Sequence, residues 1–275
     1  MKIMPSIAIP MPHAADREYA ERAIPQYERA VTLAGGKPVR IALHQTAAEV
    51  MNAIQGCDGV LLPGSKADVD PARFHAERSP HAAATDSRRE EVDNLLLEDA
   101  YLMRKPVLGI CYGLQSLNVY RAGSLIQHIP DFLPLELRGK VNHEAGKTVA
   151  VAHKVAIEPG SKLGQIVCGE RGGVSPGREP SIEVVSPSRH AVGTGLVVAV
   201  NSSHHQAADV AGTGLRVVAH CPDDGIVEAL EGTAADHFVL AVQWHPERSV
   251  DQDEPSRAIF RALVEAASQR PGASA

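Results

Sequence analysis

The sequence lacks the features that mark several large classes of protein. Its 275 residues carry a net charge of −6, and no run of Lys and Arg is longer than two residues, which argues against nucleic acid as a partner. No apolar stretch approaches the roughly 18 residues of a membrane span, so we expect no membrane partner. Residues 1–6 lack the apolar core and the cleavage site of a signal peptide. We therefore expect a cytoplasmic protein.

Cysteine is also scarce, with Cys57, Cys111, Cys168 and Cys221 far apart in the chain. The absence of a Cys-x-x-Cys pair excludes a zinc knuckle and a dithiol redox motif. Free thiols suit a reducing compartment, which agrees with the expected location. Hydrophobic residues make up 44% of the chain, enough for one large core, and we expect a single domain over residues 1–275 with a frayed tail at 270–275.

One stretch carries the first chemical signal. Residues 105–110 are largely apolar and predict a short strand, and Cys111 then stands between Gly109 and Gly113 at the start of an expected helix. A Gly-x-Cys-x-Gly turn is the cysteine form of a nucleophile elbow, in which the glycines permit a sharp turn. The helix N-terminus would favour the thiolate of Cys111. By itself the pattern is equally compatible with a buried structural cysteine.

A second stretch, near the C-terminus, contains residues that could serve as the base for the nucleophile and as the group that orients this base. The apolar run 238–242 predicts a buried strand, and His245 and Glu247 follow its end. His245 can take the proton of Cys111, and Glu247 can fix the tautomer and orientation of the imidazole. Catalytic groups of α/β sheets gather at the carboxyl ends of strands, so the sequence predicts a Cys-His-Glu triad.

Four segments resemble one superfamily. Residues 108–115 and 242–247 are similar to the signature segments of class I glutamine amidotransferases. Within that superfamily, residues 200–206 (Val-Asn-Ser-Ser-His-His-Gln) resemble the corresponding segment of the gamma-glutamyl-gamma-aminobutyrate hydrolases, the peptidase C26 family. Residues 61–71 resemble the family's glycine-rich oxyanion segment. The resemblance spans residues 7–267 and implies a three-layer α/β fold, with a mixed, mostly parallel central sheet and helices on both faces.

The turn after the expected strand 59–62 has a chemical interpretation. Thioester formation passes through an oxyanion, which needs amide donors already in place. We expect one donor at Tyr112 and another in the turn formed by Gly64 and Ser65, where many relatives have Gly-Gly. From this segment alone, a plain strand-to-loop turn is equally compatible. Asp68 and Asp70 beyond it are interpreted as residues that structure the loop.

The resemblance also implies contacts with a substrate. Gln115 lies one helical turn past the nucleophile and would contact the glutamyl group. The implied substrate-recognition segment contributes Ser203, His204, His205 and Gln206. Adjacent histidines on an extended chain point to opposite faces, so His204 and His205 give little support for a metal, and we expect neither a metal nor a cofactor.

Three further histidines, His128, His143 and His153, are expected to be surface or strand residues without a catalytic part. The polar segment 73–87 is expected to be a surface loop, with a lid over the site as one interpretation.

Element order agrees with the implied fold. Strand and helix patterns alternate in the first half, with a proline at position 25 inside the first helix, so that its main part could begin there. Thr46 to Glu49 predicts a capping box. An antiparallel portion is expected from 145–235, and 158–195 reads as loop apart from a weak strand. The expected strands are 7–10, 39–43, 59–62, 107–110, 148–157, 182–185, 196–200, 215–221, 226–230 and 239–242, and the expected helices are 16–34, 46–56, 88–104, 112–121 and one from 255.

These observations predict a cysteine-dependent hydrolase that cleaves a gamma-glutamyl amide through a glutamyl thioester. A glutaminase subunit that supplies ammonia to a separate synthetase is the alternative, and a binding protein that kept the fold is a third. Tyr112 stands where the resembled hydrolases often have Arg, so the leaving amine could differ from gamma-aminobutyrate, for example a polyamine-derived amine such as putrescine. The expected partner is a small gamma-glutamyl substrate, and the sequence leaves a homodimer open.

Overall fold

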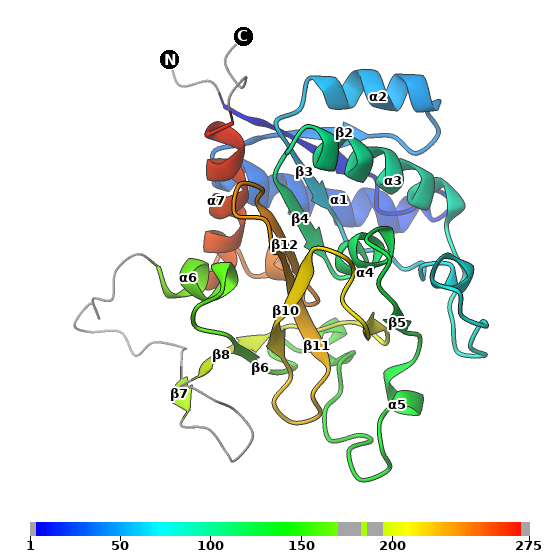
Figure 1. Ribbon diagram of the computed structural model, residues 1–275, viewed down its shortest axis with the longest axis vertical. Helices are drawn as coiled ribbons and strands as arrows, with labels where there is room; N and C mark the ends of the chain where they lie inside the picture. The colour runs from blue at the N-terminus through cyan, green and yellow to red at the C-terminus, as the bar shows by residue number, and fades with distance from the viewer. Residues whose placement is uncertain (1–3, 170–182, 186–194, 271–275) are drawn as a thin grey trace.

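The computed structural model describes residues 4–169, 183–185 and 195–270, and these form an α/β structure around one ten-stranded sheet (Figure 1). The strand order is β2-β1-β3-β4-β12-β11-β10-β6-β8-β7. The sheet is mixed, as the sequence predicts, and the strands that carry the candidate site belong to its parallel half. The expected tail lies almost entirely at 271–275, outside the described residues.

The parallel half is built from short, apolar strands. Its members are β1 (Ser6–Pro10), β2 (Lys37–Ile41), β3 (Gly59–Leu62), β4 (Val107–Ile110) and β12 (Val239–Val242). Every residue of β3, β4 and β12 is buried, as expected for strands with helices on both faces. The strand β12 pairs in parallel with β4 on one side and antiparallel with β11 on the other. It is therefore the seam between the two halves of the sheet.

The antiparallel half continues from this seam. It consists of β6 (His153–Ile157), β7 (Glu183–Val185), β8 (Gly195–Val200), β10 (Leu215–His220) and β11 (Val227–Gly232). The strands β10 and β11 form the hairpin predicted from the turn at 222–225. In Figure 1 this half extends below the helical layers. A separate two-stranded ladder pairs β5 (Leu125–Ile126) with β9 (Ala207–Ala208).

Helices cover both faces of the parallel half. On one face lie α1 (Arg17–Leu33) and α7 (Glu254–Ser268), which contact each other and β1. The other face carries α2 (Ala47–Gln55), α3 (Ser87–Leu102) and α4 (Tyr112–Tyr120). Each face has its own core of buried apolar residues. The short elements are α5 (Ile129–Phe132), α6 (Lys162–Cys168) and the 3-10 turns η1 (Pro71–Phe74), η2 (Ala145–Lys147) and η3 (Pro246–Arg248).

The capping box predicted at Thr46 is confirmed, but the prediction that the main part of the first helix could begin at Pro25 is wrong. The capping box of Thr46 and Glu49 is present at the start of α2. In contrast, α1 begins at Arg17, with Asp16 as its N-cap, and runs through Pro25. Pro25 is exposed, so the carbonyl of Glu21 that loses its amide partner can bond to water.

Two expectations for the antiparallel half were also wrong. The strand expected over 148–157 begins only at His153, because β8 ends at Val200, the partner of His153, and residues 148–152 form no regular element. Val149 and Val151 are exposed rather than aligned on one face. The segment 158–195, expected to be loop, contains α6, whose N-cap Ser161 accepts a hydrogen bond from the Gly164 amide. Residues 170–182 and 186–194 lie outside the described residues.

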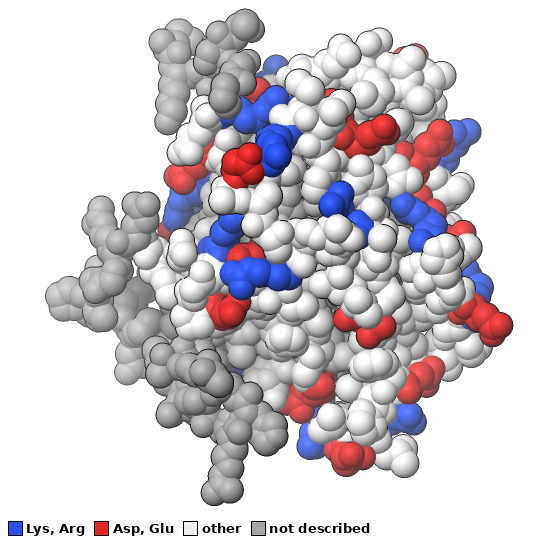
Figure 2. Space-filling view, in the orientation of Figure 1, with Lys and Arg blue, Asp and Glu red and all other residues white. Residues whose placement is uncertain are grey.

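No helix in the described part of the chain combines the length and the apolar character needed to cross a membrane. On the face shown in Figure 2, cationic and anionic side chains are interspersed, without one continuous area of either sign.

The two glycines of the elbow are required by close backbone approaches. A Cβ on Gly113 would lie 2.1 Å from the Leu62 carbonyl oxygen at the end of β3. A Cβ on Gly109 would lie 2.7 Å from the Gly113 carbonyl oxygen. In both cases the obstacle is backbone, which cannot move aside as a side-chain tip can. These contacts fix α4 against β3 and β4.

We therefore expect Gly113→Ala to destabilise the protein by roughly 1–3 kcal/mol or more, despite the better helix propensity of alanine, because the new methyl group overpacks the turn. Chemical denaturation would measure the change. Gly160→Ala is the matched control, since no atom lies within 4 Å of a Cβ placed there. Equal stability of the two variants would contradict the close approach.

Candidate active site

Cys111 occupies a strained backbone position between β4 and α4. Its φ is +53° and its ψ is −106°, a conformation that costs a non-glycine residue about 1–3 kcal/mol. The Cys111 amide donates to the Val242 carbonyl at 2.8 Å, which ties the elbow to the end of β12. The residue is buried, and it is the N-cap of α4, so its side chain lies at the positive end of that helix.

His245 and Glu247 lie just beyond the end of the neighbouring strand. The register pairs Ile110 of β4 with Val242 of β12, so the elbow and the residues after β12 emerge at the same edge. Nδ1 of His245 lies 2.7 Å from Oε1 of Glu247, and both side chains are buried. The structure thus brings together the three residues of the predicted triad, which come from segments more than 130 positions apart in sequence.

The electrostatics of His245 follow from this arrangement. Burial lowers the pKa of His245, but the Glu247 carboxylate and the Cys111 thiol raise it to about 9. Burial raises the pKa of Glu247, but the charge of His245 outweighs it and holds that pKa below the usual value. The site therefore favours a protonated imidazole that is hydrogen-bonded to the Glu247 carboxylate.

Asn201 fixes the backbone of the histidine, since its Oδ1 accepts from the His245 amide at 3.0 Å. Asn201 lies one position past the end of β8, so the antiparallel half holds the base in place. It belongs to the segment singled out by resemblance, but its role was not predicted from the sequence.

The two amides of the Gly64-Ser65 turn differ in their availability. The Gly64 amide donates to the hydroxyl of Tyr27 at 3.0 Å, so it is already engaged. The Ser65 amide has no hydrogen-bond partner among the described residues. The Tyr112 amide belongs to the first turn of α4, where amides lack a carbonyl partner within the helix. Ser65 and Tyr112 thus offer the donors that remain open.

A buried arginine, Arg89, donates a hydrogen bond to the backbone at this turn. Arg89 on α3 is fully buried, donates to the Pro63 carbonyl at 2.6 Å and to the Pro12 carbonyl at 3.1 Å, and pairs with Asp93 at 2.7 Å. Its guanidinium also lies 4.8 Å from the centre of the Tyr112 ring. Arg89 thus links the oxyanion turn to the elbow. No local pattern in the sequence marks Arg89 for this role, because its partners come from distant segments.

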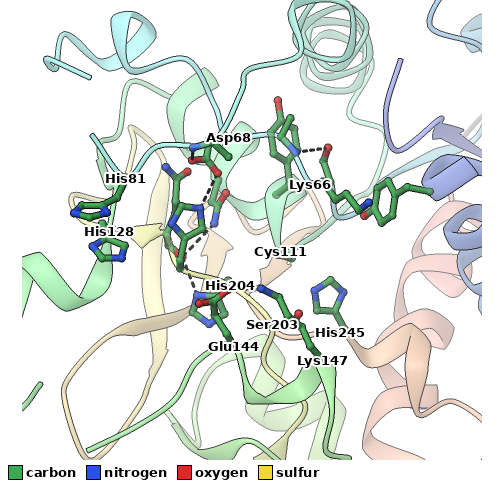
Figure 3. A pocket seen from close by; sticks show the side chains of 18 of the residues that line it. Lys66, Asp68, His81, Cys111, His128, Glu144, Lys147, Ser203, His204 and His245 are labelled. Atoms are coloured by element: carbon green, nitrogen blue, oxygen red, sulfur yellow. Dashed lines mark hydrogen bonds and ion pairs between the residues drawn. The ribbon is translucent and has the colours of Figure 1, made fainter. Parts of the chain in front are cut away.

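Cys111 and His245 line a cavity of about 600 Å³. All the residues implied by resemblance to contact a substrate line it, namely Gln115, Ser203, His204, His205 and Gln206. Figure 3 shows Cys111, Ser203, His204 and His245 around the same space, with the stacked rings of His81 and His128 at the other end. His81 and Ala83 lie in the segment 73–87, so that loop forms a wall of the pocket.

Gln115 is held by contacts with the walls of the pocket. Its Nε2 donates to the Gln206 carbonyl at 3.2 Å and to Oε1 of Gln243 at 3.4 Å. Because these contacts use the amide nitrogen, the orientation of the Gln115 side chain is fixed beside the nucleophile.

The adjacent histidines point to different partners, as the extended backbone predicts. Nε2 of His205 lies 3.1 Å from Asp68, whereas Nε2 of His204 faces Glu228 at 3.6 Å. Asp68 also accepts from the Ala83 amide, and Asp70 caps η1, so both aspartates structure their loop as expected. The expectation for His143 needs correction, because it is buried beside Glu228 and not on the surface.

Several residues of the pocket were missed by sequence reasoning. Tyr27 and Arg89 act through contacts across the fold, and no local pattern marks them. The same is true of the cations that line the cavity, which are Arg22, Lys66, Lys147 and Arg248. The Tyr112 side chain, which stands where related hydrolases often have Arg, is buried among Ala67, Val69, Val119 and Leu125.

Comparison with known proteins agrees with this geometry. The Peptidase C26 family model matches residues 5–247. The chain belongs to the Peptidase C26 family. A Mycobacterium tuberculosis protein named "Putative glutamine amidotransferase" is 35% identical over 90% of this chain and 68% of its own length. The gamma-glutamyl-gamma-aminobutyrate hydrolase of Escherichia coli O157:H7 is 32% identical, over 88% of this chain and 84% of its own.

The fold has solved counterparts. The glutaminase domain of Trypanosoma brucei CTPS, solved with bound acivicin, superposes with a TM-score of 0.58 over 98% of this chain and 95% of that domain, at 15% identity. At this identity the likeness shows the fold alone. It confirms the class I glutamine amidotransferase-like architecture predicted from the sequence.

We expect Glu247→Gln to lower the pKa of His245 from about 9 by roughly one unit or more, because the neutral amide no longer stabilises the imidazolium. Since the charged form is then lost at lower pH, the titration midpoint moves toward neutrality. Histidine NMR titration would measure it. Glu265→Gln, an exposed change on α7, is the control and should leave the midpoint in place. An unchanged midpoint in Glu247→Gln would show that the carboxylate does not set the pKa.

Proposed function

We propose that the protein hydrolyses a gamma-glutamyl amide bond by nucleophilic catalysis. The observation that carries this proposal is the arrangement of Cys111, His245 and Glu247, buried at one edge of the sheet and open to the 600 Å³ cavity. A nucleophile, a base and a group that orients the base are what acyl transfer requires. Membership of the Peptidase C26 family supports a hydrolase.

The reaction begins when His245 takes the proton of the Cys111 thiol, or already holds it in a thiolate–imidazolium pair. The Cys111 sulfur attacks the gamma-carbonyl carbon, and the carbonyl π electrons move to oxygen to form a tetrahedral oxyanion. As the oxyanion collapses, the C–N bond breaks and His245 gives its proton to the departing amine. A water molecule then adds to the glutamyl thioester, with His245 taking its proton. Collapse of this second intermediate releases glutamate, and the Cys111 thiolate and protonated His245 are restored.

The oxyanion is assigned to the amides of Ser65 and Tyr112. Preorganised amides stabilise the charge that develops on the carbonyl oxygen, and loss of one such donor typically costs 10²–10³-fold in rate. The hydroxyl of Tyr27 holds the Gly64 amide, and Arg89 holds the Pro63 carbonyl, so the turn that presents Ser65 is fixed before substrate arrives.

The charged side chains that line the cavity bear on which leaving amine the substrate carries. Four cationic side chains line it, against the carboxylates of Asp68 and Glu144. Asp68 is paired with His205, and Glu144 with Lys147. Lys66 and Arg22 pair with Asp16 and Glu18, which do not line the cavity, so the lining itself carries more positive than negative charge. One cation suits the alpha-carboxylate of the glutamyl group, and a second would suit a carboxylate on the leaving amine. We therefore favour an acidic amine such as gamma-aminobutyrate over a polyamine.

The rival function is that of a glutaminase that supplies ammonia to a partner synthetase. The name of the Mycobacterium tuberculosis relative favours it, since that protein is called a glutamine amidotransferase. The two functions differ in the preferred leaving group, which is ammonia for a glutaminase and a substituted amine for the proposed hydrolase.

The deciding experiment is amine release from a panel of gamma-glutamyl conjugates of gamma-aminobutyrate, putrescine and ammonia. Wild type should release the amine from conjugates, and Cys111→Ala should be slower by roughly 10³-fold or more while keeping the fold, because the nucleophile is absent. Release from glutamine alone would favour the glutaminase. No release from folded wild type would overturn the hydrolase proposal.

A second variant tests the preference for an acidic amine. Lys147→Gln leaves the Glu144 carboxylate unpaired at the cavity, so the rate ratio between the gamma-aminobutyrate and putrescine conjugates should fall by roughly twofold to fivefold, as for an exposed charge pair. Lys140→Gln, an exposed change outside the cavity lining, should leave this ratio as in wild type. A ratio that rises or stays constant in Lys147→Gln would count against the proposed selectivity.

A further inference from the structure

A second group of buried polar side chains lies behind the wall of the pocket, in the antiparallel half. His153 comes from β6, Glu228 from β11, His143 from the segment before η2, and His204 from the loop after β8. All four are at least nine-tenths buried, and Glu228 is fully buried. Their potential ligand atoms lie within 4.8 Å of one another. The proposed hydrolysis uses none of them chemically.

The outward nitrogen of each imidazole is held by an acceptor. Nε2 of His143 contacts Oδ2 of Asp224 at 2.8 Å. Nδ1 of His153 contacts the backbone carbonyl of the next residue at 2.9 Å, and Nδ1 of His204 contacts the carbonyl of Gln206 at 2.8 Å. An acceptor at one nitrogen keeps the proton there, so in each neutral ring the other nitrogen presents a lone pair. Metal-binding histidines are oriented by outer partners of this kind.

The inward nitrogens converge on one carboxylate oxygen. Nδ1 of His143, Nε2 of His153 and Nε2 of His204 lie 3.2, 3.4 and 3.6 Å from Oε1 of Glu228. Among the described residues, none of these nitrogens and neither oxygen of Glu228 has a hydrogen-bond partner. Three lone pairs and a negative charge thus face one another in a dry interior, which is costly unless a cation lies between them.

The three distances from the histidine nitrogens to Oε1 of Glu228 match those of a tetrahedral metal site. Ligand atoms about 2.1 Å from a common Zn²⁺ lie roughly 3.4 Å apart at the corners of a tetrahedron. The three nitrogen–oxygen separations scatter closely around that value. Imidazole nitrogen with a single carboxylate is also a donor set that suits Zn²⁺ better than Mg²⁺ or Ca²⁺.

We propose that His143, His153, His204 and Glu228 bind a divalent transition-metal ion, with Zn²⁺ the best match, as a structural site distinct from the catalytic triad. Four protein ligands close the coordination shell, which is typical of a structural site. Asp224 and the two backbone carbonyls form its outer shell. Through His204 the ion would fix the segment Ser203 to Gln206, which forms part of the cavity wall.

Protonation of His143 is the alternative to metal binding in this cluster. Burial lowers the pKa of His143, but its contacts with the carboxylates of Asp224 and Glu228 raise it to about 9. A protonated His143 beside Glu228 would relieve part of the repulsion, but two further lone pairs would remain without a partner. Metal binding and protonation give different results in a direct binding experiment.

The test is Zn²⁺ binding by the full chain carrying Cys111→Ala, so that the catalytic thiolate cannot hold the metal. After incubation with micromolar Zn²⁺ and desalting, metal analysis should find about one equivalent per chain. Adding Glu228→Gln or His153→Gln should lower the retained metal at least fivefold, and Zn²⁺ should no longer raise the melting temperature. His44→Gln, an exposed histidine elsewhere in the chain, is the matched control and should retain the full equivalent.

A spectroscopic measurement covers the case in which the cluster variants do not fold. Co²⁺ added to the same Cys111→Ala chain should give the intense visible bands of a tetrahedral ion, without the near-ultraviolet charge-transfer band of a thiolate ligand. Retention of less than a tenth of an equivalent by the folded chain would overturn the proposal and favour protonation. Equal retention in the folded cluster variants, or a thiolate band, would also overturn it.

Discussion

The left-handed backbone of Cys111 is the constraint on which the active site depends. A cysteine at a φ of +53° persists only where its surroundings leave no alternative. Here these contacts are made by backbone. Gly113 packs against the end of β3, and Gly109 packs against Gly113. The Cys111 amide is hydrogen-bonded to the Val242 carbonyl of β12. The parallel strands therefore hold the nucleophile in a geometry that the local sequence would not adopt alone.

The same strands distribute the remaining parts of the machinery. The turn proposed to hold the oxyanion follows β3, the proposed nucleophile follows β4, and the proposed base follows β12, so three neighbouring strand ends would supply the three roles. Buried polar side chains hold the turn and the histidine in place by hydrogen bonds. Tyr27 and Arg89 bind the backbone of the turn after β3, and Asn201 binds the His245 amide. Each makes hydrogen bonds in the interior, where an unpaired group would cost about 1–3 kcal/mol.

Features that depend on a short stretch of residues could be predicted from the sequence. Features that depend on contacts between distant segments could not. The elbow, the capping box at Thr46 and the residues of the triad segments follow from local patterns. The site residues themselves stay predictions until activity is measured. The continuation of α1 through Pro25 depends on solvent exposure, which periodicity did not reveal at that position. The late start of β6, at His153, depends on where its partner β8 ends. The histidine cluster joins four separate segments, so no spacing in the sequence announces it.

The position of β12 as the seam of the sheet has a consequence for the order of events during synthesis. The residues of the elbow have been synthesised once the chain reaches residue 120, but β12, which accepts the Cys111 amide and leads to His245, comes more than 100 residues later. Contacts of such large sequence separation form late, after slow loop closure. A nascent or partly folded chain therefore carries the cysteine without its imidazole partner. Its thiol gains its acid–base partner only when the last strand has been inserted between the two halves.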